Sequence, residues 1–403
     1  MEPIYIVAAK RTPIGSFNGA LSPVSAPTLG ATAIKGALNQ CHINPTLIDE
    51  VIVGNVLSAG IGMGPGRQAA MQAGIPETVP AYTLNMICGS GMKTVMDAAS
   101  HIKAGDAEIV VACGMESMSQ APFIQTHQVR GGVRMGSISL EDSIITDGLT
   151  DAFNQYHMGM TAENIAESLS ISREEQDAFA LSSQLKAANA LETHGFRTEI
   201  EPIEVSVRRQ QYTVEMDEYP KANTTSDSLA RLRPAFKKEG TVTAGNASGI
   251  NDGAAAIILA SKSAVERYQL QPIAEVVSYA QAGLSPDMMG LGPVPAIANA
   301  LEKTTLSLQD IEVFELNEAF AAQALGVAKQ LAEQHNVDQN WLLERTNHNG
   351  GAIALGHPLG ASGIRIIVSL VYELERQNKD YGLASLCIGG GMGTAVILKR
   401  CAA

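Results

Sequence analysis

The 403-residue sequence has no long hydrophobic run, and this absence narrows the class of protein. No apolar stretch approaches the roughly 20 residues that a transmembrane helix needs, so we expect a soluble protein that does not bind membranes. Residues 1–7 begin with an acidic residue and continue into a strand-like segment, unlike a secretory signal or an arginine-rich transit peptide. The sequence therefore predicts a cytoplasmic location.

Cysteine and positive charge are also scarce. The five cysteines are an odd number, which argues against a disulfide framework, so we expect any important cysteine to be a free thiol. Lys and Arg total 28 against 41 Asp and Glu, and this acidic balance argues against nucleic-acid binding, which needs a positive field. A local basic cluster suits phosphate groups or is only a solvated surface; it consists of Arg231, Arg233, Lys237 and Lys238.

Glycine and short apolar runs, by contrast, are abundant. The 38 glycines separate runs such as 109–111 and 257–259, a pattern typical of buried parallel strands joined by tight turns. Strand-like and helical stretches alternate in residues 1–119 and again from about 250 onwards, which predicts an α/β fold with more than one packed unit. The segment 120–247 differs in composition and contains a helical run, Thr161 to Ala190, so we interpret it as an insertion or lid.

A faint internal repeat relates the two α/β regions. Residues 50–55 align with 312–317, and at the same offset Asn85, Cys88 and Gly89 fall on Asn347, Gly350 and Gly351. So few matches also arise by chance. If the repeat is genuine, it predicts two similar halves, each placing a functional residue at a shared seam.

Cys88 is followed directly by a glycine and by the start of an amphipathic helical pattern. Apolar residues recur by threes and fours at Met92, Val95, Met96 and Ala99, which predicts a helix that begins just after the cysteine. A thiol at a helix N-terminus becomes easier to ionise, so this arrangement resembles a nucleophile elbow. The alternative is a small buried hydrophobic residue, as most free cysteines are.

Three further residues occupy glycine-rich or strand-end positions. His357 stands in a glycine-rich loop before a helical run and suits a general base or oxyanion donor, although a lone histidine is more often structural. Cys387 follows a strand-like run and precedes a triple glycine, which lacks the spacing and lysine of a phosphate loop and instead suits an oxyanion hole. Asn317 ends another strand-like run. Its amide suits the orientation of a water or a substrate carbonyl, and the alternative is that it caps a helix.

Taken together, these motifs resemble the thiolase family. The resemblance rests on the motifs that begin at Cys88 (Cys-Gly-Ser-Gly-Met), Asn317 (Asn-Glu-Ala-Phe-Ala), Gly356 (Gly-His-Pro-Leu-Gly-Ala-Ser-Gly) and Cys387 (Cys-Ile-Gly-Gly-Gly-Met-Gly), and it extends from Arg11 to the C-terminus. It implies a duplicated, five-layered αβαβα fold with an inserted loop domain. The implied division is an N-terminal half at 1–119 plus 248–273, a loop domain at 120–247 and a C-terminal half at 274–403.

The resemblance also implies an activity. The Tyr156-His157-Met158-Gly159 stretch is similar to the biosynthetic type, which condenses two acetyl-CoA to acetoacetyl-CoA and CoA with no further cofactor and no metal; the alternative is a degradative 3-ketoacyl-CoA thiolase of broader chain length. In this reading Cys88 is the nucleophile, Cys387 the carbon base and His357 the helper of both, while Asn317 holds a water and Gly389 lends an oxyanion N–H. The implied coenzyme A contacts are Leu149, His157, Met158, Lys221, Ser228, Ala235, Phe236, Ser248, Ala319 and Phe320.

Other readings and two departures from the family pattern accompany this resemblance. A decarboxylating ketoacyl synthase has no second cysteine base, and a lipid carrier needs no reactive thiols. A loop at 135–139 beside Arg130 and Arg134 resembles the one that pairs thiolase dimers into tetramers, so we expect a homo-oligomer. The segment 328–345 is longer than is usual in the family, which suggests surface decoration, and His348 replaces a small apolar residue.

Overall fold

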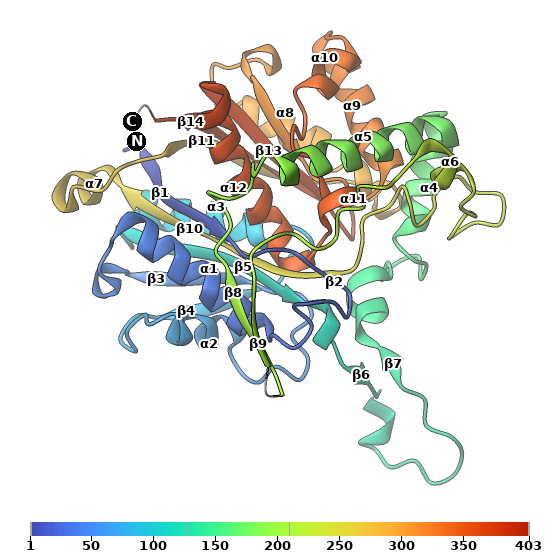
Figure 1. Ribbon diagram of the computed structural model, residues 1–403, viewed down its shortest axis with the longest axis horizontal. Helices are drawn as coiled ribbons and strands as arrows, with labels where there is room; N and C mark the ends of the chain where they lie inside the picture. Colours follow the sequence, from blue (N-terminus) through green and yellow to red (C-terminus); the bar gives the residue numbers. More distant parts are fainter. Residues whose placement is uncertain (1, 126, 209, 402–403) are drawn as a thin grey trace.

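A mixed β-sheet runs through the whole molecule (Figure 1). The computed structural model describes residues 2–125, 127–208 and 210–401. The strand order along the sheet is β4-β3-β5-β10-β1-β11-β14-β13-β12, with β2 paired to β10. The strands are β1 (Ile4–Arg11), β2 (Gly15–Ser16), β3 (Glu50–Gly54), β4 (Ala81–Leu84), β5 (Ile109–Ser117), β10 (Asn251–Ser261), β11 (Ala274–Gly283), β12 (Val313–Leu316), β13 (Tyr381–Ile388) and β14 (Met392–Arg400).

Together the helices and the two ends of the sheet form the five layers that the family resemblance implies: helix, sheet, helix, sheet, helix. Helices α1 (Ala26–Cys41) and α2 (Pro65–Gln72) cover the outer face of the N-terminal strands, and α8 (Pro293–Leu301) and α9 (Ala321–His335) cover that of the C-terminal strands. Helices α3 (Ser90–Ala104) and α12 (Leu359–Gln377) pack together in a shared central core between them. Shorter helices are α7 (Lys262–Tyr268), α10 (Gln339–Glu344) and α11 (Ala352–Leu355). The predicted αβαβα arrangement is confirmed.

Strands covered on both faces explain the continuous apolar runs in the sequence. In β3, Val51 and Val53 enter the outer core, whereas Ile52 between them enters the central core. Ile257 and Ile258 of β10 divide in the same way. Because successive side chains of a strand point to opposite faces, a strand between two helical layers needs an apolar residue at every position.

The two halves of the sheet repeat one topology. In the N-terminal half β3 pairs in parallel with β5, which pairs antiparallel with β10; in the C-terminal half β12 pairs in parallel with β13, which pairs antiparallel with β14. The match of β3 with β12 is therefore confirmed. The match of Cys88 with Gly350 is wrong. Cys88 directly precedes α3, and the counterpart of α3 in the C-terminal half is α12. The residues just before α12 are those of the His357 loop, and α11 separates them from Gly350.

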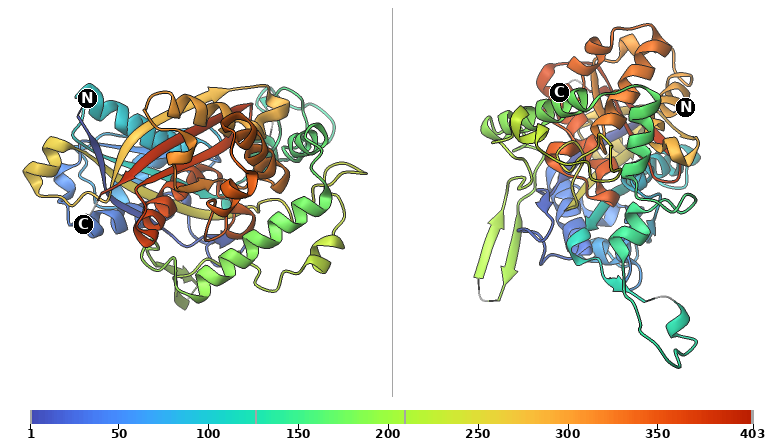
Figure 2. Two further views of the ribbon diagram at one scale, coloured as in Figure 1. Left: turned by 90° about the horizontal axis from the view of Figure 1, so that it is seen from above. Right: turned by 90° about the vertical axis from the view of Figure 1, so that its right-hand side faces the viewer.

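The middle segment consists of short elements laid over the α/β body. These are β6 (Phe123–Ile124), β7 (Glu141–Asp142), a π-helix (Ile144–Leu149), α4 (Gly159–Ser168), α5 (Arg173–Glu192), β8 (Ile203–Val207), β9 (Gln210–Val214) and α6 (Ser226–Ala230). The hairpin of β8 and β9 and the loop between β6 and β7 project from the body in Figure 2. None of the helices in the described ranges has the length and apolar character needed to cross a membrane.

Two expectations about helices need correction. The run from Thr161 to Ala190 is not one helix, because α4 ends at Ser168 and Ser172 begins α5 with a capping box to Glu175. The long 328–345 segment does more than decorate the surface, since Leu331 and Leu342 are fully buried in the outer core of the C-terminal half. The apolar positions of this segment are core positions of α9 and α10.

Candidate active site

The Cys88 thiol is presented by a strained turn between β4 and α3. Ile87, immediately before it, has a backbone φ of +49°, a left-handed conformation that a β-branched residue rarely adopts. Hydrogen bonds hold the turn: the Ile87 N–H donates to Asn85 Oδ1 at 2.9 Å, and Ser90 Oγ donates to the Ile87 carbonyl at 2.7 Å. Helix α3 begins at Ser90, so the predicted helix start just after the cysteine is confirmed. The strained turn before it has the geometry that a nucleophile elbow requires.

Burial, however, outweighs the helix terminus in setting the ionisation of Cys88. Loss of solvation raises the pKa of its thiol to about 11, although hydrogen bonds from the Gly389 and Cys88 N–H groups lower it. The expectation that the helix terminus makes this thiol easy to ionise is therefore wrong. Cys88 is protonated at neutral pH and needs a base when it reacts.

His357 is available as that base. Its side chain is buried, and its Nδ1 lies 2.6 Å from Ser362 Oγ, which donates to the Pro358 carbonyl at 2.9 Å. Because the serine proton is already used, Nδ1 carries the imidazole proton and Nε2 is the acceptor. Nε2 has no hydrogen-bond partner among the described residues, and burial together with Arg365 lowers the His357 pKa to about 4. The histidine is thus neutral at physiological pH.

A buried carboxyl fixes the histidine loop to the N-terminal half. Glu116, at the end of β5, accepts hydrogen bonds from the Gly360 N–H at 2.9 Å and from the Val56 and Leu57 N–H groups at 3.0 and 3.1 Å. Burial raises its pKa to about 7, while these N–H groups lower it. The sequence analysis missed both Glu116 and Ser362. The one signal in the sequence for a role of Glu116 was its position, since an acidic residue near the end of a mostly apolar strand is unusual.

Cys387 reaches the same region from the other half of the molecule. It is the penultimate residue of β13, paired with Gly393 of β14, so its predicted place at the end of a strand is confirmed, and it is 1% exposed. Burial and the neighbouring Cys88 thiol raise its pKa. The turn that follows contains Gly390 and Gly391, both at φ +85°, a conformation that glycine adopts without strain. The structure therefore brings the two predicted thiols together, each from one half of the repeat.

Asn317 completes the set of buried polar groups. Its side chain is 1% exposed, and neither its Oδ1 nor its Nδ2 has a hydrogen-bond partner in the part of the chain that the structure describes. The helix-cap alternative is wrong, because α9 begins at Ala321 with Phe320 at the cap position. A buried amide with both ends unpaired is costly unless a ligand or water uses it.

Most of the residues assigned to coenzyme A form one apolar wall beside Cys387. Met158, Ala319 and Phe320 share a buried cluster with Cys387, and Phe236 packs against it. The rings of His157 and Phe236 stack with centroids 4.6 Å apart, and Phe236 meets Phe320 edge-on at 6.1 Å. Backbone hydrogen bonds connect three more of the assigned residues to this wall, namely the half-buried Leu149 and Ser248 and the exposed Ala235: the Met158 N–H donates to the Leu149 carbonyl, the Ser248 N–H to the Ala319 carbonyl and the Ala235 N–H to the Val242 carbonyl.

The last two assigned residues, Lys221 and Ser228, lie on exposed backbone outside this wall. Lys221 Nζ lies 5.3 Å from the centre of the Tyr219 ring, and Ser228 belongs to the capping box of α6 with Thr225. In the nearby basic cluster Lys237 is exposed and pairs with Glu167 at 2.9 Å. The structure thus leaves these cations accessible to a charged ligand.

His348, the titratable departure from the family pattern, is not part of this site. Burial lowers its pKa, and the charged groups that act on it are Glu373, Lys186, Arg345 and Arg376 rather than the thiols. Within the described ranges no group of three or more His, Cys, Asp or Glu side chains is arranged to hold a metal ion.

Comparisons with known proteins agree with this geometry. The model of the thiolase N-terminal domain matches residues 4–263, and the model of the thiolase C-terminal domain matches residues 270–400. The chain belongs to the thiolase family. This thiolase is 52% identical over 398 residues to the acetyl-CoA acetyltransferase of Chromobacterium violaceum, covering 98% of this chain and 99% of the relative. It is 50% identical over 401 residues to the cytosolic acetyl-CoA acetyltransferase of Rattus norvegicus, covering 99% of this chain and 98% of the relative.

A solved relative shows the same architecture. The human mitochondrial 3-ketoacyl-CoA thiolase in complex with CoA superposes on this thiolase with a TM-score of 0.93 and 45% identity, covering 100% of this chain and 98% of the other. The fold inferred from the motifs is therefore the fold of a known thiolase over its full length.

Proposed function

We propose that this thiolase catalyses the reversible Claisen condensation of two acetyl-CoA to acetoacetyl-CoA and CoA, through an acetyl group carried on Cys88. One observation supports this most strongly: the partly exposed thiol of Cys88 lies close enough to the buried thiol of Cys387 to raise the pKa of Cys387, and the Gly389 N–H donates to Cys88. A decarboxylating ketoacyl synthase has no use for the second thiol, and a lipid carrier has no use for either. Relatives about half identical over the full length are acetyl-CoA acetyltransferases.

In the proposed first half-reaction, His357 Nε2 accepts the Cys88 proton as the thiolate attacks the acetyl-CoA carbonyl. The Nδ1–H bond to Ser362 holds the ring in the required tautomer and stabilises the imidazolium that forms. The C–S bond to CoA breaks, and the Cys387 thiol, protonated because burial raises its pKa, gives its proton to the leaving CoA thiolate. Acetyl-Cys88, imidazolium and Cys387 thiolate remain.

The second half-reaction uses those charges. The Cys387 thiolate removes a proton from the methyl carbon of a second acetyl-CoA, and the enolate oxygen is stabilised by the His357 imidazolium and a water held by Asn317. The enolate carbon attacks acetyl-Cys88, while the N–H groups of Cys88 and Gly389 bind the oxyanion. Collapse releases acetoacetyl-CoA, and the Cys88 thiolate regains its proton from His357. All steps are proton or acyl transfers, so the proposal includes no metal or redox cofactor beyond the CoA thioester.

We assign the binding of coenzyme A to the residues that the resemblance selects. The wall made by His157, Phe236 and Phe320 suits the pantetheine arm, because an aromatic face covers a flexible apolar chain at little entropic cost. Lys221 and the basic cluster, accessible at the surface, suit the phosphates. In this proposal residues 120–247 form the loop domain of coenzyme A binding and oligomer contacts.

The acyl pocket is expected to limit chain length. Met158, Met289 and Phe320 are at most 8% exposed and pack around Cys387, so extra methylenes have no room. We expect kcat/KM for thiolysis of acetoacetyl-CoA to exceed that for a long-chain 3-ketoacyl-CoA by about 100-fold or more. Equal values would favour the broader degradative alternative.

A pair of methionine variants locates this limit. Met289→Ala should raise kcat/KM for a 3-ketohexanoyl substrate relative to acetoacetyl-CoA by about 10-fold, because it opens the wall beside Cys387. Met63→Ala is the matched control, since the Met63 side chain is 96% exposed, and should leave the ratio unchanged. The pocket assignment fails if both variants leave the preference where it was.

We also propose a homo-oligomer, and a homotetramer in particular. Strand β6 and the loop that leads from it to β7 expose apolar side chains that a monomer has no reason to present: Phe123 of β6 and Met135, Ile138 and Leu140 of the loop are 64%, 94%, 50% and 58% exposed. We expect multi-angle light scattering at micromolar concentration to give four chains, and Met135→Asp with Ile138→Asp to give two. A monomeric wild-type protein would contradict both statements.

For cellular location we propose the cytoplasm. The support is the acidic net charge, which disfavours anionic surfaces, and the relative of Rattus norvegicus, which is described as cytosolic.

A further inference from the structure

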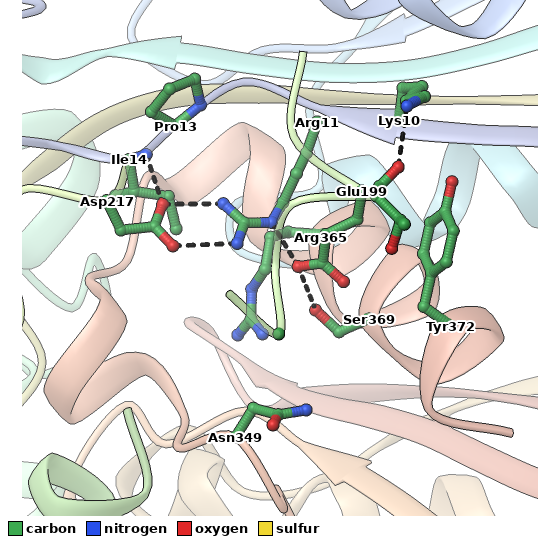
Figure 3. Close-up of polar contacts among 12 residues, drawn as sticks. Lys10, Arg11, Pro13, Ile14, Glu199, Asp217, Asn349, Arg365, Ser369 and Tyr372 are labelled. Atoms are coloured by element: carbon green, nitrogen blue, oxygen red, sulfur yellow. Dashed lines mark hydrogen bonds and ion pairs between the residues drawn. The ribbon is translucent and has the colours of Figure 1, made fainter. Parts of the chain in front are cut away.

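Buried charges fill the seam between β1, the middle segment and α12. Figure 3 shows Arg11 bonded to Asp217 and Glu199, with Ser369 of α12 reaching Glu199. Arg11 Nε lies 2.6 Å from Glu199 and its Nη1 2.7 Å from Asp217, and the three side chains are 0% exposed. Arg11 is therefore a fully paired cation, and the loss of its solvation is offset by two short ion pairs.

Arg365, beside this group on α12, is not paired in the same way. Its side chain is 3% exposed, and its contact with Glu315 of β12 is 3.5 Å long. Its Nε and Nη1, like Glu315 Oε2, have no hydrogen-bond partner among the residues described, and no dashed line reaches Arg365 in Figure 3. Burial raises the pKa of Glu315 to about 8 despite Arg365, so near neutral pH the carboxyl is mostly uncharged. Arg365 keeps its proton and remains a buried positive charge with no carboxylate of the described residues at hydrogen-bond distance, although Glu199 and Glu318 also act on it from farther away.

We propose that Arg365 is a positioning residue for the reaction: its buried charge acts through His357, holds the imidazole in the neutral form and sets the lower pH limit of Cys88 acylation. The inference rests on the proposed function. The His357 imidazole lies against α12, with Nδ1 2.6 Å from Ser362 Oγ, and Arg365 follows Ser362 by three residues, so it lies about one turn further along the same face of the helix. A unit charge about 10 Å away, in an effective dielectric of about 20, shifts a titration by roughly one pH unit.

The other charged groups around His357 do not replace Arg365. The elements packed on α12 contribute Arg11 from β1, Glu116 from β5, Asp252 from β10, Glu315 from β12 and the thiols of Cys88 and Cys387. Burial raises the pKa values of Glu116, Asp252 and both thiols, so each of these groups carries less negative charge than it would in water. Arg11 is paired with two carboxylates. Burial lowers the pKa of His357, and Arg365 is the charged group that lowers it further.

The test follows the rate of Cys88 acetylation by acetyl-CoA against pH, in a single turnover read by mass spectrometry. Arg365→Gln should move the acidic limb of this profile upward by about one pH unit, because the imidazolium no longer meets a buried positive charge. Arg365→Lys keeps the positive charge, so the midpoint of the acidic limb should stay within a few tenths of a pH unit of the wild-type value. Glu315→Gln should also leave it in place, because Glu315 is already protonated in the acidic range. A merely structural role would lower the rate equally at every pH and would overturn the proposal.

A second measurement is independent of the chemistry. The ¹³Cε1 resonance of His357, assigned by comparison with His357→Asn, reports its titration directly in wild type and variants. If the wild-type protein is never acetylated, the proposed function fails. The His357 resonance still shows in that case whether Arg365 influences the titration of His357. If Arg365→Gln does not fold, Arg365→Met with Glu315→Gln removes both charges at similar volume and should show the same upward shift. An unchanged His357 titration in a folded variant without the Arg365 charge refutes the inference.

Discussion

Cys88→Ala is expected to abolish acetylation of the protein and exchange of labelled CoA into acetyl-CoA, whereas Cys387→Ala should abolish only condensation. Without Cys88 no sulfur attacks the thioester, and the loss should be on the order of 10⁴-fold or more in every assay. Without Cys387 the attack on acetyl-CoA still occurs, because His357 still accepts the Cys88 proton. Acetylation then slows, since the leaving CoA thiolate receives no proton from Cys387, but a burst of CoA should remain.

Intact-protein mass spectrometry after incubation with acetyl-CoA separates these outcomes. Cys387→Ala should carry one acetyl group and form no acetoacetyl-CoA, and Cys88→Ala should carry none. Cys41→Ala is the matched control: this half-buried thiol on α1 donates to the Ala37 carbonyl, and its loss should leave both half-reactions near wild type. Acetylated Cys88→Ala together with unmodified Cys387→Ala would reverse the roles assigned to the two thiols.

His357→Ala is expected to impair both half-reactions. The imidazole takes the Cys88 proton in the first half and stabilises the enolate oxygen in the second, and each role contributes about 10²-fold or more. The pKa of Cys88 is raised to about 11 by burial, so without the base very little thiolate forms at neutral pH. The rate of Cys88 acetylation in His357→Ala should rise about tenfold per pH unit in alkaline solution, as hydroxide replaces the base.

His348→Asn provides the control for loss of a partly buried histidine. His348 lies among Glu373, Lys186, Arg345 and Arg376 rather than at the thiols, so both half-reactions should continue at nearly the wild-type rate. Ser362→Ala is the intermediate case, because it removes only the bond that fixes the imidazole tautomer. If His357→Ala acetylates Cys88 as fast as wild type while failing to condense, the histidine serves the second half alone.

The sequence predicted the local elements well where one physical rule decided them. The helix after Cys88 follows from its apolar spacing, and strands such as β10 follow from apolar runs that fit a sheet covered on both faces. Two features were misplaced for different reasons. The break in the helix expected over 161–190 is local, because Ser172 and Glu175 form a capping box that was readable in the sequence but overlooked. The core role of the 328–345 segment, by contrast, depends on packing against the rest of the chain.

Sequence alone determined the family, the fold class and the chemical types at the site, because the motifs at Cys88, Asn317, His357 and Cys387 each require a specific residue in a specific turn. Tertiary structure alone decided the ionisation of those groups. Cys88 was expected to ionise easily at a helix terminus, yet its burial raises its pKa. The tautomer of His357 depends on its contact with Ser362, and the position of its loop depends on the bond from the Gly360 N–H to Glu116. Its pKa depends on burial and on the charge of Arg365. Desolvation and long-range charge depend on everything packed around a residue, so neighbours in sequence do not reveal them.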